Sequence, residues 1–194
     1  PAPLTPIEDL EALGWSELQQ TVMACTACDL HNLRQQTVFG RGSTQAKWMI
    51  VGDIPRLEDE WKQHPFSGES GELLDGMLAS IGVESNSLYI TNLLKCRPPL
   101  DRAPDQEQAA SCLSYLRRQI DLLKPTLIIL MGRDTIRQVL GSNEPMARLR
   151  QQVHQREGIS APMVATYHPA YLLKQPRLKL QAWQDLQFAK RAMQ

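Results

Sequence analysis

The stretch Thr126-Leu-Ile-Ile-Leu-Met131, stopped by Gly132, decides the fold that this sequence predicts. An unbroken apolar run of this length is typical of a strand that is buried on both faces. Three further runs have the same character: Lys47-Trp-Met-Ile-Val-Gly52, Ser87-Leu-Tyr-Ile-Thr-Asn-Leu-Leu-Lys95 and Met163-Val-Ala-Thr-Tyr167. Strands of this kind occur in parallel sheets that lie between layers of helices.

The segments between these runs have helical spacing of apolar residues. They predict helices near 7–24, 73–82, 104–124, 133–141 and 178–193, with loops at 53–68 and 142–160. Strands that alternate with helices indicate an α/β protein. We therefore expect a three-layer α/β/α fold with a central four-stranded, mainly parallel sheet. Residues 1–24 would form a leader and helix, and residues 25–194 a single domain.

Composition sets outer limits on this protein. The chain has 194 residues, of which 42% are hydrophobic, enough for one compact domain with a sizeable core. No run is long enough for a membrane span and no export leader opens the chain, so we expect a cytoplasmic location. The net charge is zero, but residues 1–84 carry 13 acidic and five basic side chains, whereas residues 85–194 carry eight acidic and 16 basic. This split is typical either of solvated helix faces or of a surface for a polyanion.

Four cysteines are all that the chain contains, set as Cys25-x-x-Cys28, Cys96 and Cys112. A close pair with two distant single residues is the right number for one four-thiolate metal site. Disulfides are the alternative, but nothing else suggests a secreted protein. A redox Cys-x-x-Cys should follow a strand and open a helix, which this pair does not. Spacing alone leaves zinc and a [4Fe–4S] cluster open.

Polar residues follow the predicted strands at their carboxyl ends, where parallel α/β sheets bind ligands. Asp53, Asn92, Gly132-Arg133 and His168 all fall there. Each alone is weak evidence, because a strand asparagine is often a core amide and a histidine before proline is often a loop residue. Phe66 lies in the first loop above the same edge, where it either forms a wall for a flat heterocycle or fixes the loop to the core. The shared location predicts one pocket.

Together these residues resemble the family 4 uracil-DNA glycosylases, the iron–sulfur branch of the uracil-DNA glycosylase superfamily. The resemblance covers roughly residues 22–190, in order. Its motifs are Cys25-x-x-Cys28-x-Leu30, Val51-Gly52-Asp53-Ile54-Pro55 with Glu58-Asp59, Pro65-Phe66-Ser67-Gly68-Glu69-Ser70-Gly71, Tyr89-Ile-Thr-Asn92-Leu-Leu-Lys95-Cys96-Arg-Pro-Pro99, Cys112, and Tyr167-His168-Pro169-Ala170.

The resemblance implies a role for each site residue. Phe66 would stack on a flipped base, Asn92 would read the uracil edge, and His168 would stabilise negative charge on O2. The segment Gly52, Asp53, Ile54 and Pro55 would line the pocket, with the carboxylate of Asp53 positioning water or the sugar cation. Cys25, Cys28, Cys96 and Cys112 would bind [4Fe–4S] in preference to zinc. Leu172, Leu173 and Lys174 would wedge into the DNA and hold phosphate, beside the basic Arg177 and Lys179.

One motif departs from the family. Its first active-site motif usually reads Gly-Glu-Ala-Pro-Gly, whereas this chain has Gly52-Asp53-Ile54-Pro55-Arg56. Asp53 has a carboxylate one methylene shorter than the family's glutamate, and Arg56 stands where the family has glycine. These two differences leave two functions open. The first is a glycosylase that excises uracil from DNA. The second is a non-catalytic protein resembling the psi subunit of the bacterial replicative clamp loader, with a chi-like subunit or single-strand binding protein as partner. A zinc-binding structural domain is a third reading.

Overall fold

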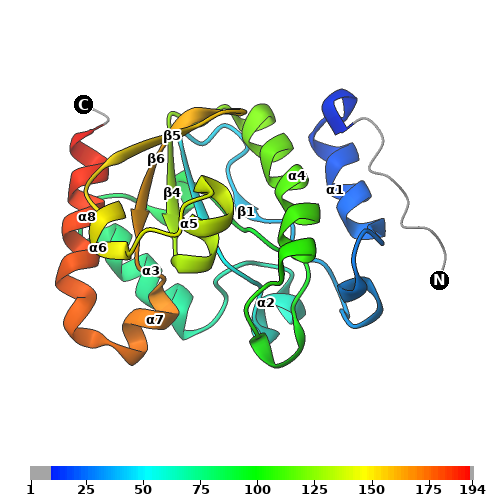
Figure 1. Cartoon of the computed structure of the whole chain (residues 1–194), viewed down its shortest axis with the longest axis horizontal. Coiled ribbons are helices and arrows are strands. Elements are labelled where there is room, and N and C mark those ends of the chain that lie inside the picture. Colours follow the sequence, from blue (N-terminus) through cyan, green and yellow to red (C-terminus); the bar gives the residue numbers. More distant parts are fainter. Residues whose placement is uncertain (1–9, 193–194) are drawn as a thin grey trace.

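The computed structural model describes residues 10–192, in which a six-stranded sheet lies between two layers of helices (Figure 1). The spatial order of the strands is β1-β3-β2-β4-β6-β5. Their bounds are Arg41–Gly42 for β1, Trp48–Gly52 for β2, Tyr89–Asn92 for β3, Leu127–Met131 for β4, Val153–Arg156 for β5 and Ile159–Thr166 for β6. The four inner strands are parallel, and each edge strand is antiparallel to its neighbour. The predicted three-layer fold is confirmed, but the prediction of four strands missed the edge strands β1 and β5.

Eight α-helices connect and cover the strands within the described residues. They are α1 Trp15–Ala24, α2 Leu57–Lys62, α3 Glu69–Ala79, α4 Gln106–Leu123, α5 Arg133–Leu140, α6 Met146–Leu149, α7 Pro169–Lys174 and α8 Lys179–Arg191. Short 3-10 turns occupy Leu10–Ala12, Asp29–Asn32, Ser85–Ser87, Pro99–Asp101 and Pro176–Leu178. Two predicted loops are therefore wrong in part, because 53–68 contains α2 and 142–160 contains α6 and β5, and the segment after His168 forms α7. From residue 10 to residue 192, no helix has the length and apolar character to cross a membrane.

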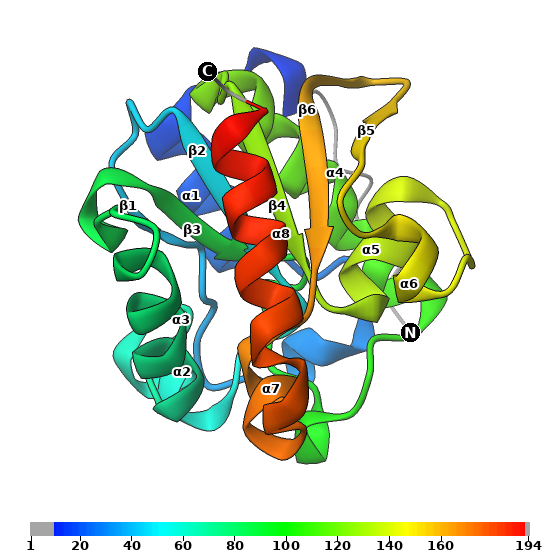
Figure 2. The ribbon, with the colours of Figure 1, turned by 90° about the vertical axis from the view of Figure 1, so that its left-hand side faces the viewer.

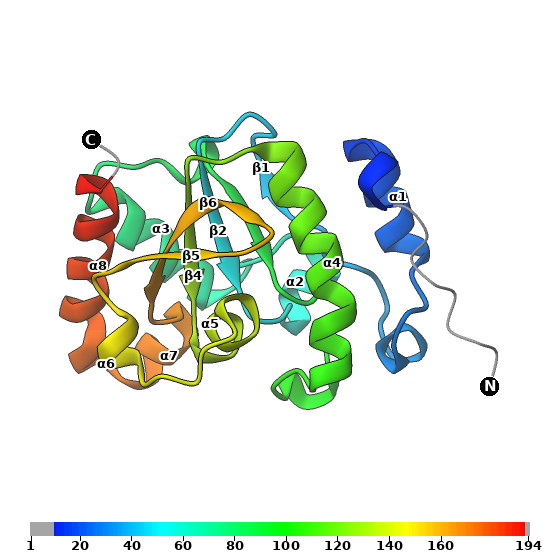
Figure 3. The same ribbon diagram turned by 45° about the horizontal axis from the view of Figure 1, so that its top comes forward.

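Each face of the sheet packs on its own pair of helices. Alternate residues of one strand point to opposite faces, so Met49 of β2 contributes to the core under α4 and α5, whereas Ile50 contributes to the core under α3 and α8. Figure 2 shows α8 running across the second face, and Figure 3 shows α4 between the sheet and α1. Burial on both sides explains why the inner strands are apolar without alternation.

Helix α1 lies outside the three layers and packs against α4 (Figure 1). Leu18 and Val22 of α1 are buried with Phe39 and with Tyr115 of α4. These contacts join α1 to the rest of the core. The boundary that we placed after residue 24 stays a prediction, and residues 1–9 of the expected leader lie outside the described range.

Candidate active site

The carboxyl ends of the parallel strands bring the candidate residues together. Asp53 follows β2 directly, Asn92 is the last residue of β3, and His168 comes two residues after β6. Strands β3, β2, β4 and β6 are consecutive neighbours in the sheet. The polar side chains that follow them therefore meet at one edge, as the parallel topology predicts.

Phe66 and His168 are in direct contact at this edge. Their rings stack with centroids 5.1 Å apart and planes inclined by 21°. Phe66 has a left-handed backbone (φ 57°), and its carbonyl oxygen lies against the Cα of Gly71, where any side chain would collide with it. Arg41 of β1 donates a hydrogen bond from Nε to the carbonyl oxygen of Pro65 (3.0 Å). An unusual backbone fixed by two neighbours therefore sets the position of the phenyl ring.

Asn92 lies against the same ring, across Gly52. A Cβ atom added to Gly52 would lie 2.7 Å from Phe66 Cζ, and nearer still to Asn92 Oδ1. Both side chains thus pack over the bare Cα of Gly52, a close approach that only glycine permits. Asn92 is 2% exposed and Phe66 6%. The phenyl ring, the carboxamide and the imidazole are therefore adjacent in a largely water-free site.

The hydrogen bonding of His168 defines its tautomer. The Ala170 N–H donates to His168 Nδ1 (3.1 Å), because His168 caps the start of α7. Nδ1 must then be the acceptor, so a neutral ring carries its proton on Nε2. Burial lowers the pKa of His168 from its ordinary value, which favours this neutral form. Nε2 lies 3.4 Å from Asp53 Oδ1. The site therefore presents an N–H donor beside a carboxylate.

Asp53 is held by its own backbone neighbour and by one cation. The Ile54 N–H donates to Asp53 Oδ1 (2.7 Å), and Arg56 Nη2 lies 3.7 Å from Asp53 Oδ2. Arg56 also faces Asp101, with Nη1 3.7 Å from Oδ2. The guanidinium therefore stands between two carboxylates, and its buried Nε has no hydrogen-bond partner among the described residues.

A buried carboxylate joins the two loops that carry Asp53 and Phe66. Asp59 of α2 accepts hydrogen bonds from the backbone N–H groups of Arg56 (2.9 Å) and Ser67 (2.7 Å). Burial raises the pKa of Asp59, while these N–H groups act in the opposite direction. Asp59 thereby fixes the distance between the first motif and the aromatic wall.

Two buried polar networks support the site from behind. Lys95 Nζ donates to Thr91 Oγ1 (2.6 Å), to the carbonyl oxygen of Asn92 (2.8 Å) and to Gln119 Oε1 (2.7 Å). Behind His168, Asp185 of α8 accepts from Arg150 Nε (2.8 Å) and from Thr166 Oγ1 (2.8 Å). The first network holds the end of β3, and the second holds the end of β6.

A cleft of about 590 Å³ opens beside Asp53 and His168. Its other walls come from the start of α5, from the segment before α6 and from α7, and they include Arg133, Tyr167 and Tyr171. Phe66 and Asn92 do not line it. Phe66 and His168 stack on each other, so a base could stack on this face of the phenyl ring only if the two rings move apart.

The four cysteines gather beside this edge as free thiols. Cys28, Cys96 and Cys112 belong to one buried cluster with Leu30, Ile54 and Leu94, and Cys25 packs at the edge of the neighbouring cluster. Burial raises the pKa of Cys28 to about 11 and that of Cys112 to about 12, and the nearby thiols add to both shifts. The side chain of Ile54 packs among these sulfur atoms, while its backbone N–H faces Asp53; the expectation that the backbone of this segment lines the base pocket stays a prediction.

The thiols are neighbours without forming a tight cage. Between residues 10 and 192, no three His, Cys, Asp or Glu side chains are close enough to hold a single metal ion. The surroundings nevertheless suit a thiolate-bound group, because Arg34 Nη1 donates to Cys96 Sγ (3.1 Å) and the Ala27 N–H to Cys25 Sγ (3.4 Å). Gln108 of α4 donates to Asp29 Oδ1 (2.7 Å), which ties the Cys25–Cys28 loop to the helix that carries Cys112.

The prediction that Leu172, Leu173 and Lys174 wedge into the DNA is wrong for one of these residues. Leu172 is fully buried in α7, so its side chain is not available to a ligand. Leu173 is 39% exposed, and Lys174, Arg177 and Lys179 also face solvent. The basic residues of this segment thus remain accessible, whereas the leucine at its centre belongs to the core.

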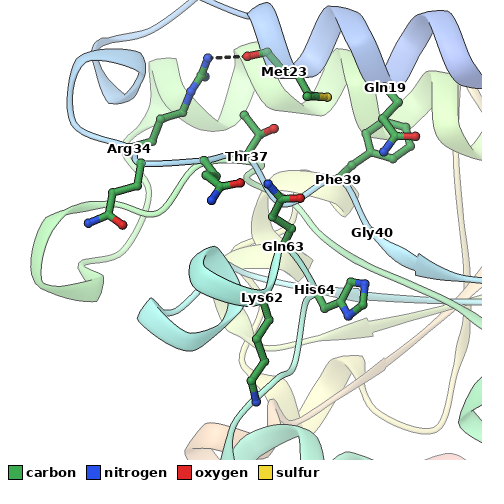
Figure 4. A pocket seen from close by; sticks show the side chains of 11 residues that line it. Gln19, Met23, Arg34, Thr37, Phe39, Gly40, Lys62, Gln63 and His64 are labelled. Carbon is green, nitrogen blue, oxygen red and sulfur yellow. Dashed lines mark hydrogen bonds between the residues drawn. The ribbon is translucent and has the colours of Figure 1, made fainter.

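A second hollow, of about 340 Å³, lies between the end of α1 and the end of α2 (Figure 4). Polar side chains such as Gln19, Thr37 and Gln63 form most of its walls, and Arg34 at its rim donates to the carbonyl oxygen of Met23 (3.0 Å). None of Asp53, Phe66, Asn92 and His168 lines it. This hollow is separate from the candidate active site.

Comparisons with known proteins agree with the fold. Residues 39–187 match the family model described as the uracil DNA glycosylase superfamily. The chain belongs to this superfamily. Its relatives include proteins named type-4 uracil-DNA glycosylase from Archaeoglobus fulgidus (36% identical, over 84% of this chain and 85% of the relative), Pyrobaculum aerophilum (34%; 88% and 90%) and Thermotoga maritima (32%; 81% and 82%). Its place within the superfamily is the type-4 branch, as the sequence motifs predicted.

Several residues that shape the site carried no recognised signal in the sequence. Asp59 stood in a quoted motif without a role, and Lys95 and Asp185 were not singled out as site residues. For Asp59 the available signal was its place as the third residue of a helix, where a carboxylate caps the first turn. Nothing local distinguishes Lys95, because its partners lie on β3 and on the distant α4.

Proposed function

We propose that this protein removes uracil from DNA by hydrolysing the N-glycosidic bond of a nucleotide flipped out of the strand. One observation carries the proposal: an aromatic ring, an amide and a neutral imidazole adjoin at the carboxyl edge of the sheet, with a carboxylate beside the imidazole. The type-4 relatives, which are named for this activity, support it. A cytoplasmic location forms part of the proposal.

Recognition of the base would fall to Phe66 and Asn92. Phe66 offers its face for stacking once His168 moves aside. The Asn92 amide N–H can donate to O4 of uracil, and its oxygen can accept from N3–H. Cytosine presents the opposite donor and acceptor at these atoms, so a fixed carboxamide would be left unpaired against it. The close packing over Gly52 supports this role, because it fixes the position of the carboxamide.

Bond cleavage would use His168 and Asp53. As the bond between C1′ and N1 breaks, negative charge grows on O2 of uracil, and His168 Nε2–H can donate to it. A neutral donor suits this task, because it stabilises the anion without transferring a proton in advance. Asp53 can stabilise the cationic sugar and take the proton of the water that attacks C1′. Arg56 neutralises part of this carboxylate, which predicts a slower reaction than an unpaired carboxylate would give.

The four cysteines are proposed to hold a [4Fe–4S] cluster. In a [4Fe–4S] cluster each thiolate binds a different iron, so the four sulfur atoms lie farther apart than the four ligands of one zinc ion. The thiols of this protein are neighbours, but no three of them within the described residues are close enough to hold one metal ion, which favours the cluster. When bound, the cluster would supply a covalent brace. Ile54, next to Asp53, packs against the cysteines, and Cys96 follows the end of β3 that carries Asn92. The cluster would therefore stiffen the segments that carry Asp53 and Asn92.

Contacts to the DNA backbone are proposed for the exposed residues after His168. Leu173, Lys174 and Arg177 lie on or beside α7, next to the cleft. Cations at this place would pair with phosphates on either side of the flipped nucleotide, so affinity should fall steeply with added salt. An affinity that does not respond to salt would argue against this contact.

A non-catalytic role in a replication complex remains the competing proposal, with a chi-like subunit or single-strand binding protein as partner. The ion pair between Arg56 and Asp53 favours it, because it occupies the carboxylate. Incubation with a uracil-containing oligonucleotide, followed by alkali, separates the two proposals. Strand cleavage that His168→Ala abolishes supports the enzyme. Intact strands, from protein whose cluster is present, support the partner protein.

A further inference from the structure

Arg34 connects the end of helix α1 to one of the four cysteines. Its Nη2 donates a hydrogen bond to the carbonyl oxygen of Met23 (3.0 Å), in the last turn of α1, and its Nη1 donates to Cys96 Sγ (3.1 Å). The backbone N–H of Arg34 donates to the carbonyl oxygen of Leu30 (3.0 Å), in the short turn that follows Cys28. The backbone and the guanidinium are therefore both fixed, and the guanidinium has a set direction toward the sulfur.

The positive charge of Arg34 has no carboxylate partner in the part of the chain that the structure describes. None of the salt bridges between residues 10 and 192 includes it. Glu60, a buried carboxylate of α2, accepts instead from the backbone N–H of Gln35 (2.8 Å). An arginine is always charged, and a charge that is partly withdrawn from water needs an opposite charge or a strong acceptor beside it. A cysteine that binds iron is a thiolate, so Cys96 would supply that opposite charge in the loaded protein.

Arg34 also stands between this sulfur and the hollow at the ends of α1 and α2. Its half-buried side chain is part of the wall of the hollow of about 340 Å³, whereas none of the four cysteines lines it (Figure 4). Cys96 is 3% exposed. The other walls are mostly polar, so the hollow can hold water. Removal of the guanidinium would extend this water-filled space toward Cys96.

We propose that Arg34 retains the metal cluster in this protein, because its guanidinium stabilises the negative charge on the Cys96 sulfur and closes the cluster against the hollow. This inference rests on the proposed [4Fe–4S] cluster. Groups that hydrogen-bond to a metal ligand orient the ligand and tune the metal site, and their loss typically weakens metal binding 10- to 100-fold. Arg34 acts through Cys96 and is therefore a positioning residue.

Release of iron to a chelator tests the proposal without any DNA. Fully loaded protein would be mixed with excess EDTA in oxygen-free buffer, and the loss of its visible absorption would be followed with time. Arg34→Ala, which removes both the donor and the charge, should lose iron about tenfold faster than the unaltered protein. Arg34→Lys, which keeps a charged donor, should lose iron more slowly than Arg34→Ala.

Lys62→Gln is the matched control. Lys62 lines the same hollow, but its Nζ donates to the carbonyl oxygen of Ser67 (3.3 Å) and to no sulfur. This variant should lose iron at the rate of the unaltered protein.

Resonance Raman spectra of the loaded proteins give a second measurement that does not depend on unfolding. A hydrogen bond to a ligand sulfur weakens the bond between that sulfur and iron. Arg34→Ala should therefore shift an iron–sulfur stretching band to higher frequency, and Lys62→Gln should leave the spectrum unchanged.

The proposal is overturned if Arg34→Ala keeps its iron as long as the unaltered protein, if its iron–sulfur bands do not shift, or if Arg34→Lys protects no better than Arg34→Ala. Failure of the proposed activity is recognised separately, because neither measurement involves DNA. A loaded protein that releases no uracil from an oligonucleotide would refute the enzyme and leave the role of Arg34 intact. A colourless unaltered protein would overturn the cluster and the role of Arg34 together.

Discussion

Gly52→Ala is the substitution that most sharply tests the arrangement of the base slot. The added Cβ would lie 2.7 Å from Phe66 Cζ, whereas carbon atoms rest at about 3.5 Å, and it would press harder still on Asn92 Oδ1. Both groups must therefore retreat by roughly 1 Å. A displacement of this size in a catalytic site costs about 100-fold in rate. We expect kcat/KM for uracil release to fall about 100-fold, with about 1–3 kcal/mol of lost stability from overpacking.

Activity is measured as the release of uracil from a labelled oligonucleotide. The stability of each variant is measured separately by urea denaturation. Gly76→Ala is the matched control, since Gly76 lies within α3 and nothing would stand within 4 Å of its Cβ. This control should gain about 1 kcal/mol of stability and keep its activity. Normal activity in Gly52→Ala would refute the reasoning, because it would mean that Phe66 and Asn92 do not need their observed positions.

Three other changes have expected outcomes. Burial lowers the pKa of His168 below its ordinary 6.5, so near and below that pH the unfolded chain binds a proton that the folded chain does not. The unaltered protein should therefore lose unfolding free energy as the pH falls from about 7.5 to about 5.5, and His168→Gln should lose less. An equal loss in the two proteins would contradict the burial argument. Lys95→Met leaves three buried acceptors without a donor and should cost about 3 kcal/mol or more in urea denaturation, whereas a neutral effect would mean that water replaces the ammonium. Cys112→Ser should abolish broad visible absorption and bound iron in the purified protein, and a colourless unaltered protein with stoichiometric zinc would overturn the cluster assignment.

The inner sheet could be predicted because both of its faces are buried. Runs such as Thr126–Met131 are unbroken in apolar character and too short for a buried helix, so they are typical of a buried strand. The edge strands gave no comparable signal. Strand β1 has two residues, and β5 reads Val-His-Gln-Arg with alternating burial, because it lies at the edge and pairs with one neighbour only. Helix α2 was missed because it is only six residues long and lies between Pro55 and Pro65, although its acidic first turn suits a helix start.

The candidate site was partly predictable for a topological reason. In a parallel sheet, the residue after each strand falls at one edge, so Asp53, Asn92 and His168 could be grouped without coordinates. Contacts between distant segments could not be obtained this way. The position of Arg56 between Asp53 and Asp101 depends on a turn 45 residues away in the chain. The burial of Leu172 follows from helix α7, whose start was signalled by Pro169 at its first position.

Direct detection of the released base tests the central claim most simply. The purified protein, with its metal content established, would be incubated with oligonucleotides that carry uracil, thymine or cytosine at one position, and the free bases would be measured by mass spectrometry. We predict free uracil from the first substrate, no base from the other two, and none from any substrate with His168→Ala. Uracil that stays attached to the DNA in the presence of cluster-loaded protein would contradict the account.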